Sequence, residues 1–382
     1  MKILVIYQRS GAGISIFYKR LICELAQRAT VDVLTDCEDI ERYEGCGIRN
    51  LYTQPFTPKM KEWDRKFIKR VGRFLMSEWW AYKLRNTIGN DYDVVLSCIA
   101  STQLMPCASG SYIAKRLKCK HAIYAVDAIP GPGGWTPPKI YKWRLKAVRR
   151  YFPQADYVAA SNKHMLDFQL TTFKHKPTLL SNVLLTPSPD TTYEYPISQE
   201  NIFLYTGTLY GLRNSDYLLN AFKRILQVHT DAQLIFAGKV LELKDIDNIF
   251  TADERKHITI LPHTNDLGSL FARAKVLIDI DADLDKDPFL SSKIVTYIKV
   301  NRMIVCETGH DTPSREMFAH LNTVIQCDHN TDSLYNGMMQ ALDMAGKEQD
   351  YSERKPLIKE FSTERVGSIL WNDLLKVCNK TE

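Results

Sequence analysis

Two hydrophobic periods alternate along the first half of the chain. Short apolar runs, typical of buried strands, are separated by longer stretches in which apolar residues recur at helical spacing, as from Ile14 to Leu25. This alternation predicts a parallel sheet wrapped by helices. The predicted strands are Lys2 to Tyr7, Val31 to Leu34, Asp93 to Ser97, Ala122 to Val126 and Tyr157 to Ala160.

A second alternating series follows the segment Thr186 to Gln199, whose Pro, Ser, Thr and Asp content indicates a linker. We therefore predict an α/β protein with two Rossmann-like, doubly wound domains facing across a cleft. The domains are expected at residues 1–185 and 200–355, with a terminal helix within 356–382. The second set of predicted strands is Ile202 to Tyr205, Gln233 to Ala237, Ile258 to Leu261, Val276 to Ile280, Met303 to Cys306 and Thr323 to Gln326.

Composition narrows the class of protein. The 382 residues include no apolar run of about 18 or more, and Met1 leads directly into a predicted strand, which favours a cytosolic protein. Nine cysteines without a CxxC pair indicate neither a disulfide framework nor a zinc cluster. The net charge of +6 favours anionic partners without separating nucleotides, acidic lipids and nucleic acid.

Ligands of doubly wound sheets bind beyond the carboxyl ends of the strands, so the loops that follow strands carry the candidate chemistry. After the first strand, Gly11, Ala12 and Gly13 allow backbone amides to approach an anion at the start of a helix. The spacing does not satisfy GxGxxG, which disfavours a dehydrogenase. A ligand-facing loop and a merely tight turn both remain open.

The second domain opens with a strand that ends at Gly207 and Thr208, and Arg213 precedes the next predicted helix. A glycine turn at a strand end, with a permanent cation nearby, can present amides and charge to a diphosphate. The alternative is that Arg213 is simply solvated.

The segment Asp287 to Cys306 places a helix start between two predicted strands. Ser291 or Ser292 can cap this helix, and Lys293 adds a full positive charge beside its free amides, which suits phosphate oxygens. An ordinary serine-capped helix shares part of this pattern.

These motifs resemble the retaining glycosyltransferases of the group-one class, glycosyltransferase family four, whose two Rossmann domains form the GT-B arrangement. Residues of the family's donor site correspond to Ser291, Ser292, Lys293, Thr296, Tyr297, Ile304 and Val305, and its diphosphate-binding cation corresponds to Arg213. Gly11 to Gly13 correspond to the loop that faces the donor phosphates from the other domain. The resemblance also implies that the terminal helix returns to the first domain.

The chain departs from the family at the Glu-x7-Glu pair, because Pro288 and Thr296 stand where the acids are usual. Contacts that the family assigns to those acids are therefore in doubt. Where the family usually carries a His, this chain has Asp127 at the end of a predicted strand. We expect Asp127 to face an acceptor hydroxyl, with a turn or capping role as the alternative.

Two further loop residues are candidates. Trp135 lies in the Gly- and Pro-rich loop Pro130 to Pro138, where an indole can stack on a sugar face or simply pack. His263 follows a predicted strand, and the resemblance places it near the nucleotide base. Capping of the next helix by Asn265 or Asp266 is compatible with that role.

The stretch Lys59 to Arg73 combines an apolar stripe with flanking basic residues at helical spacing. This pattern occurs in surface helices attracted to anionic lipid, and also in helices that pack on a core and leave their charges in water. The resemblance favours contact with a membrane, because lipid-linked acceptors are frequent in the class. Nucleic acid is a weaker candidate because no binding module is evident.

Together with these features, the resemblance implies transfer of a sugar from a nucleotide-sugar to a saccharide or lipid-linked acceptor, with retention of anomeric configuration, in glycan or cell-surface polysaccharide biosynthesis. No metal and no cofactor beyond the donor are expected, and the enzyme is expected in the cytoplasm or at the inner face of the membrane. The open alternatives are a nucleotide-sugar epimerase and a non-catalytic nucleotide-binding relative.

Overall fold

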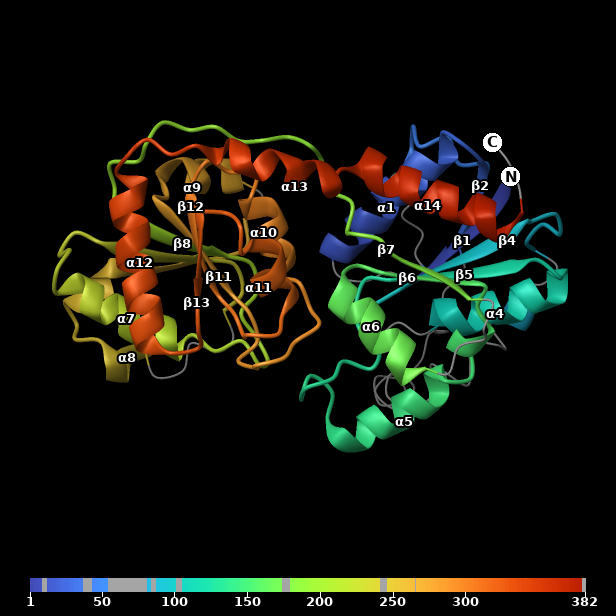
Figure 1. The fold of residues 1–382 in the computed structure, drawn as a ribbon, viewed down its shortest axis with the longest axis horizontal. Coiled ribbons are helices and arrows are strands. Elements are labelled where there is room, and N and C mark those ends of the chain that lie inside the picture. The colour runs from blue at the N-terminus through green and yellow to red at the C-terminus, as the bar shows by residue number, and fades with distance from the viewer. Residues whose placement is uncertain are drawn as a thin grey trace. The chain divides into compact units, whose positions relative to one another are not determined.

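The chain folds into two compact units, shown in the computed structural model of Figure 1. The structure describes residues 1–8, 12–36, 43–53, 81–83, 87–100, 105–173, 179–240, 246–264 and 266–379. The first unit comprises Met1–Pro189 with Glu360–Glu382, and the second comprises Asp190–Lys359. Each unit contains a parallel sheet with helices between successive strands, as the alternating pattern predicted.

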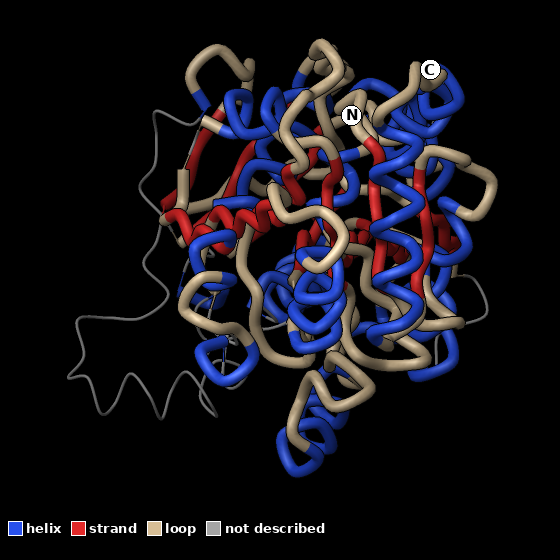
Figure 2. Tube along the Cα trace, turned by 90° about the vertical axis from the view of Figure 1, so that its left-hand side faces the viewer, coloured by secondary structure: helices blue, strands red, loops and turns tan. Residues whose placement is uncertain are grey.

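The sheet of the first unit has seven strands in the order β3-β2-β1-β4-β5-β6-β7. Its central strands β1, β4 and β5 are buried except for the first residues of β1 and β5, which explains their continuous apolar runs. Figure 2 shows strands in red with helices in blue around them. The strands are β1 (Lys2–Tyr7), β2 (Thr30–Thr35), β3 (Asn50–Thr53), β4 (Val94–Ile99), β5 (Lys120–Ala125), β6 (Tyr157–Ala160) and β7 (Leu180–Val183).

Helices α1 (Ala12–Ala26) and α14 (Thr363–Val377) share the core on one face of this sheet. A Cβ atom added to Gly367 of α14 would lie 2.1 Å from Cγ of Glu24 of α1, so the absence of a side chain permits this close packing. The carboxylate of Asp373 accepts hydrogen bonds from the Tyr157 hydroxyl at 2.9 Å and from Nδ2 of Asn182 at 2.8 Å. The other helices of the unit are α4 (Met105–Leu117), α5 (Pro138–Val148), α6 (Lys163–Thr172) and the short η3 (Phe152–Gln154).

The six strands of the second unit follow the order β10-β9-β8-β11-β12-β13, which is the Rossmann order. They are β8 (Ile202–Thr206), β9 (Gln233–Ala237), β10 (Ile258–Leu261), β11 (Val276–Ile280), β12 (Met303–Glu307) and β13 (Val324–Cys327). The helices are α7 (Asp216–Leu226), α8 (Ile246–Ile249), α9 (Leu267–Arg273), α10 (Ser292–Tyr297), α11 (Pro313–Phe318), α12 (Thr331–Ala345) and α13 (Lys355–Glu360), with η4 (Glu254–His257) and η5 (Tyr351–Arg354).

Two strands were not predicted, and both lie at sheet edges. No residue of β3 or β7 is fully buried, so their sequences carry no buried apolar run. The segment predicted as a linker also makes regular contacts. The N–H of Ser188 donates to the Phe361 carbonyl at 2.8 Å, and that of Tyr193 donates to the Lys299 carbonyl at 2.8 Å.

The sequence indicated no disulfide framework, and the structure joins one pair of cysteines. Cys23 of α1 and Cys46 are joined by a disulfide, with their Cα atoms 4.6 Å apart. Spacing along the chain cannot reveal such a pair, because the fold brings the two residues together across a loop.

The buried carboxylate of Asp373 supplies the first prediction. Asp373→Ala leaves the hydroxyl of Tyr157, whose residue is 1% exposed, without its acceptor. We expect this change to destabilise the protein by about 1–3 kcal/mol, because a buried donor that loses its partner keeps its desolvation penalty. Thermal unfolding measures the loss. Asp343→Ala is the control, since its ion pair with Lys347 is exposed; equal effects of the two changes would contradict the assignment.

Candidate active site

The order of the second sheet reverses between β8 and β11, which marks the expected ligand position beyond the carboxyl ends of these strands. Three segments meet there. The first is the turn at Gly207 after β8, the second is the end of β11 at Asp279 and Asp281, and the third is the start of α10 at Lys293. Residues that the sequence singled out at separate motifs are therefore brought together.

Lys293 is held by a buried carboxylate. Its Nζ lies 3.1 Å from Oδ1 of Asp279 and 2.9 Å from Oγ of Ser291, and the Ser291 hydroxyl donates to the same Asp279 oxygen at 2.9 Å. The lysine side chain is 10% exposed and that of Asp279 is fully buried. The ammonium group is thus fixed in place at the strand end, and part of its charge is neutralised before any ligand binds.

Of the two serines predicted to cap α10, Ser291 has the N-cap position but not the capping hydrogen bond. Ser291 does occupy the N-cap position of α10, but its side chain makes no capping hydrogen bond, because the hydroxyl is engaged with Asp279. Ser292 is the exposed first residue of the helix. Consequently the Ser291 side chain does not occupy the first amide groups of α10.

Glycine is required at position 207 because the turn after β8, the end of β9 and helix α10 come close together there. The φ of Gly207 is +100°, and an added Cβ would lie 3.3 Å from Cδ of Lys293. A Cβ on Gly238, which follows β9, would come 2.2 Å from the Gly207 carbonyl oxygen. Both positions therefore need glycine for steric reasons. Thr208 is exposed, and its carbonyl accepts a hydrogen bond of 3.1 Å from the hydroxyl of Tyr205.

Arg213 lies in the turn before α7, with its guanidinium 5.6 Å from the ring centre of Tyr210. Burial opposes its charge, but the neighbouring carboxylates of Asp281 and Asp279 outweigh burial and raise its pKa. Burial and the charge of Asp279 together raise the pKa of Asp281 to about 6, although Arg213 acts in the opposite direction. The two predicted phosphate-binding cations therefore both lie near buried acids.

Tyr297 anchors α10 to the end of β8. Its buried hydroxyl accepts a 2.8 Å hydrogen bond from the Thr206 N–H and lies 3.0 Å from the Thr206 hydroxyl. Thr296, the predicted donor residue beside it, is half-buried. The anchoring contact fixes the distance between the glycine turn and Lys293.

Sequence reasoning did not identify the pair Glu307 and His329. Glu307 ends β12 and is fully buried, and its Oε1 lies 2.8 Å from Nδ1 of His329, which follows β13. Burial raises the pKa of Glu307 to about 7 despite the opposing effect of His329. Glu307 in turn raises the pKa of His329 against the effect of burial. The only signal available in the sequence was that each residue follows a predicted strand.

The predicted acceptor residues lie in the first unit, beyond β5. Asp127 is half-buried, and its charge is one of the causes, after burial, that raise the pKa of the Tyr18 hydroxyl. Trp135 is also half-buried, in a loop that turns through Gly133 and Gly134 at φ values of 63° and 99°. The loop conformation needs these glycines.

The remaining predicted residues are dispersed. Ala12 and Gly13 begin α1, two residues earlier than predicted, whereas Gly11 and the stretch Lys59 to Arg73 lie outside the described residues. His263 is exposed in the loop after β10. The side chain of Asp266 caps α9 by accepting from the N–H of Ser269 at 3.2 Å.

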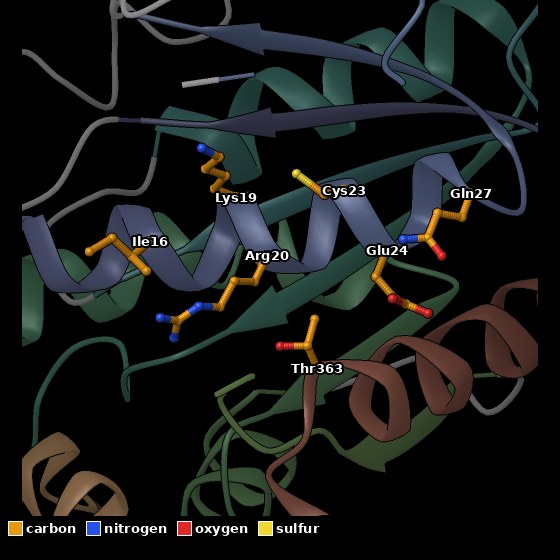
Figure 3. Close-up of a pocket in the computed structure, with 7 residues that line it drawn as sticks. All are labelled: Ile16, Lys19, Arg20, Cys23, Glu24, Gln27 and Thr363. Carbon is orange, nitrogen blue, oxygen red and sulfur yellow. The ribbon is translucent and has the colours of Figure 1, made fainter. Parts of the chain in front are cut away.

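A separate groove of about 420 Å³ lies on α1 of the first unit. Figure 3 shows its lining, in which Thr363 at the start of α14 lies opposite one face of α1. None of the predicted donor or acceptor residues lines it. The lining residues are Ile16, Lys19, Arg20, Cys23, Glu24, Gln27 and Thr363.

Within the described residues, no three His, Cys, Asp or Glu side chains are grouped so that they can hold a metal ion. No helix in the described part of the chain combines the length and the hydrophobicity needed to cross a membrane.

The sequence matches no family model and no curated protein. The fold resembles that of HepE from Anabaena in complex with UDP, with a TM-score of 0.71 and 12% identity over 98% of this chain and 100% of HepE. A glycosyltransferase from Rickettsia africae gives 0.70 with 11% identity over 100% of this chain and 99% of that one. A putative UDP-N-acetylglucosamine 2-epimerase from Listeria monocytogenes gives 0.59 with 13% identity, covering 100% and 97%.

These likenesses over whole chains, together with the two parallel sheets, confirm the predicted GT-B fold. Transferases and epimerases share this fold, and the identities are low. The reaction must therefore be argued from the site.

The Glu307–His329 pair generates a prediction on pH and stability. Because the folded pKa of Glu307 lies above its ordinary 4.5, the ionised group opposes folding increasingly as the pH rises from about 4.5 to about 7. His329, whose pKa is raised above 6.5, stabilises the folded state at lower pH and loses this effect as the pH rises through its folded pKa. Both effects lower stability with increasing pH.

We therefore expect Glu307→Gln to flatten the pH dependence of thermal unfolding between about pH 5 and pH 8. Relative to wild type, the variant should gain roughly 2–3 kcal/mol between those limits. Glu353→Gln is the control, because hydrogen bonds from Thr323 and Asn322 lower the pKa of Glu353 and its titration falls below this range. Parallel curves for wild type and Glu307→Gln would overturn the assignment.

Proposed function

We propose that this protein is a glycosyltransferase that moves a sugar from a nucleotide-sugar to an acceptor hydroxyl. The observation that carries the proposal is the arrangement at the switch point of the second unit. There Lys293, fixed by Asp279 and Ser291, lies against the glycine turn at Gly207. A positioned cation beside a turn with no side chain suits the diphosphate of such a donor.

In this proposal Lys293 and Arg213 stabilise the negative charge that develops on the departing nucleoside diphosphate. Asp279 and Asp281 act through these cations and hold them in position before the donor arrives. Fixed charges need no reorganisation during the reaction, which is the advantage of pairing them in the empty site. Glycine at position 207 lets the donor approach the backbone. No metal or cofactor is included in the mechanism.

Neighbours of the same fold support the choice of donor. HepE structures contain UDP, UDP with glucose, and UDP-glucose. We therefore propose a UDP-sugar donor, transfer with retention of anomeric configuration, and a saccharide or lipid-linked acceptor in polysaccharide biosynthesis at the inner membrane face. Asp127 and Trp135 are proposed on the acceptor side, and His263, Thr208, Ser292 and Thr296 are proposed near the donor.

An epimerase is the second candidate, because the putative Listeria epimerase and a UDP complex of MnaA from S. aureus share the fold, with TM-scores of 0.59 and 0.55. The higher scores of HepE and the Rickettsia transferase, 0.71 and 0.70, favour transfer. The reactions differ in their need for an acceptor. Interconversion of a UDP-sugar without acceptor identifies an epimerase, and donor binding without any conversion identifies a non-catalytic relative.

The test is a panel of nucleotide-sugars screened for thermal stabilisation, followed by product analysis of the hits. A ligand that binds only the folded state raises the unfolding temperature. We expect stabilisation by UDP-sugars, and transfer to a saccharide or polyprenyl-diphosphate-linked saccharide with retention. Inversion at the anomeric carbon would contradict the proposed stereochemistry, and absence of stabilisation by every nucleotide-sugar would contradict the donor site.

Lys293→Ala is expected to lower kcat/KM by about a hundredfold or more, because it removes a charge positioned for the leaving group. Since the change also leaves Asp279 buried without its cation, the double variant Lys293→Ala with Asp279→Asn keeps the site neutral. It should fold and remain inactive. Lys286→Ala is the control, because its ion pair with Asp311 is exposed. Activity of the double variant near wild type would refute the role of Lys293.

The variant Asp127→Asn tests whether Asp127 acts on the acceptor or on the donor. If Asp127 orients the acceptor, kcat falls by about tenfold or more while the Kd of the donor, measured by calorimetry, stays unchanged. Asp167→Asn, which breaks an exposed pair with Lys163 in the same unit, is the matched control. Weaker donor binding in Asp127→Asn at unchanged kcat would place Asp127 on the donor instead.

A further inference from the structure

Helix α5 of the first unit carries basic residues along one face. Lys139, Lys142 and Lys146 follow each other at spacings of three and four residues, and Arg149 and Arg150 come directly after the last helical residue, Val148. Residues at these spacings lie on the same side of a helix. All five are exposed. Figure 1 shows α5 at the lower edge of its unit, apart from the sheet.

Acidic residues do not compensate this face. The sequence contains no Asp or Glu from Ala128 to Ala155. Among the described residues, no Asp or Glu forms an ion pair within 4.0 Å of Lys139, Lys142 or Lys146. The positive potential of the face is therefore local and uncancelled along its own segment.

Apolar and aromatic side chains border the basic face. Ile140 is 38% exposed, and Tyr141 and Trp143 are half-buried. The helix is anchored at its end, because Val148 is fully buried in the core beneath it. The next residue, Arg149, donates to the Thr172 carbonyl at 3.3 Å. The helix is thus attached firmly to the unit while its charged face points to solvent.

We propose that the basic face of α5 docks the protein on an anionic lipid bilayer. Lysines attract the acidic headgroups, and Ile140 with the ring of Trp143 enters the headgroup region, where indole and aliphatic groups are favoured. This surface is distinct from the stretch Lys59 to Arg73, and it is independent of the proposed transferase reaction because it requires neither donor nor acceptor.

The combination of residues favours lipid over nucleic acid. Three of the five cations are lysines, which act as point charges, and an exposed aliphatic residue adjoins them. Proteins that bind single-stranded nucleic acid instead line a basic groove with stacking aromatic rings. Residues of α5 line none of the three grooves centred on Cys23, Arg302 and Cys119.

The test is flotation of the purified protein with vesicles of phosphatidylcholine containing about 30% phosphatidylglycerol, and with phosphatidylcholine alone. We expect binding to the anionic vesicles only, and release by salt of about 0.5 M. The triple variant Lys139→Gln, Lys142→Gln, Lys146→Gln should bind roughly a hundredfold more weakly, since each lysine near an anionic surface contributes about fivefold. Ile140→Ser should weaken binding and leave its salt dependence unchanged.

The matched control removes three exposed lysines of the second unit, Lys256, Lys347 and Lys359, which lowers the net charge equally. It should bind the vesicles like wild type. Circular dichroism and thermal unfolding establish that each variant is folded. Equal loss in the control would attribute binding to net charge, and undiminished binding of the α5 variant would assign it to another surface. Binding of single-stranded RNA that is tighter than vesicle binding and depends on the same lysines would identify the face as a nucleic-acid surface. Any one of these three results would refute the proposal.

Discussion

The candidate site depends on the ion pair between Lys293 and the fully buried carboxylate of Asp279. A buried carboxylate is costly unless a cation and hydrogen bonds compensate it, and Lys293 and Ser291 supply both. The constraint is reciprocal, because the lysine is also prevented from turning to solvent. Gly207 belongs to the same arrangement, since a side chain there would meet the aliphatic part of Lys293. One contact thereby fixes the relative positions of β8, β11 and α10.

The acids of the site lie at the ends of strands. The positions at which the resembled family carries acids are occupied here by Pro288 and Thr296, while Asp279, Asp281 and Glu307 are buried at the ends of β11 and β12. Buried acids beside Lys293 and Arg213 reduce the positive charge available to an anion. The site therefore depends on where its charges lie more than on their sum. Because burial raises the pKa of Asp281 to about 6, its protonation changes the net charge of the site near neutral pH.

The sequence predicted what local patterns encode. Continuous apolar runs identified the buried strands, and the position of Lys293 after a serine pair identified the start of α10. The edge strands β3 and β7 were not predicted, because their residues are partly exposed. The Asp279 contact reversed the expected role of Ser291, and neither Glu307 with His329 nor Cys23 with Cys46 has a short-range signature. Such partners are set by the packing of distant segments, which periodicity does not contain.

The distribution of charge gives the two units different relations to anions. Lys and Arg outnumber Asp and Glu by 50 to 44, and the segment from Ala128 to Ala155 contains six basic residues and no acid. Outside that segment, Lys and Arg are as numerous as Asp and Glu. The net charge of +6 is therefore no measure of a general affinity for anions. In the second unit, paired charges such as Lys293 and Asp279 suit a small ligand held at fixed distances. On α5, exposed lysines without an ion pair suit an extended surface whose charges have no fixed positions.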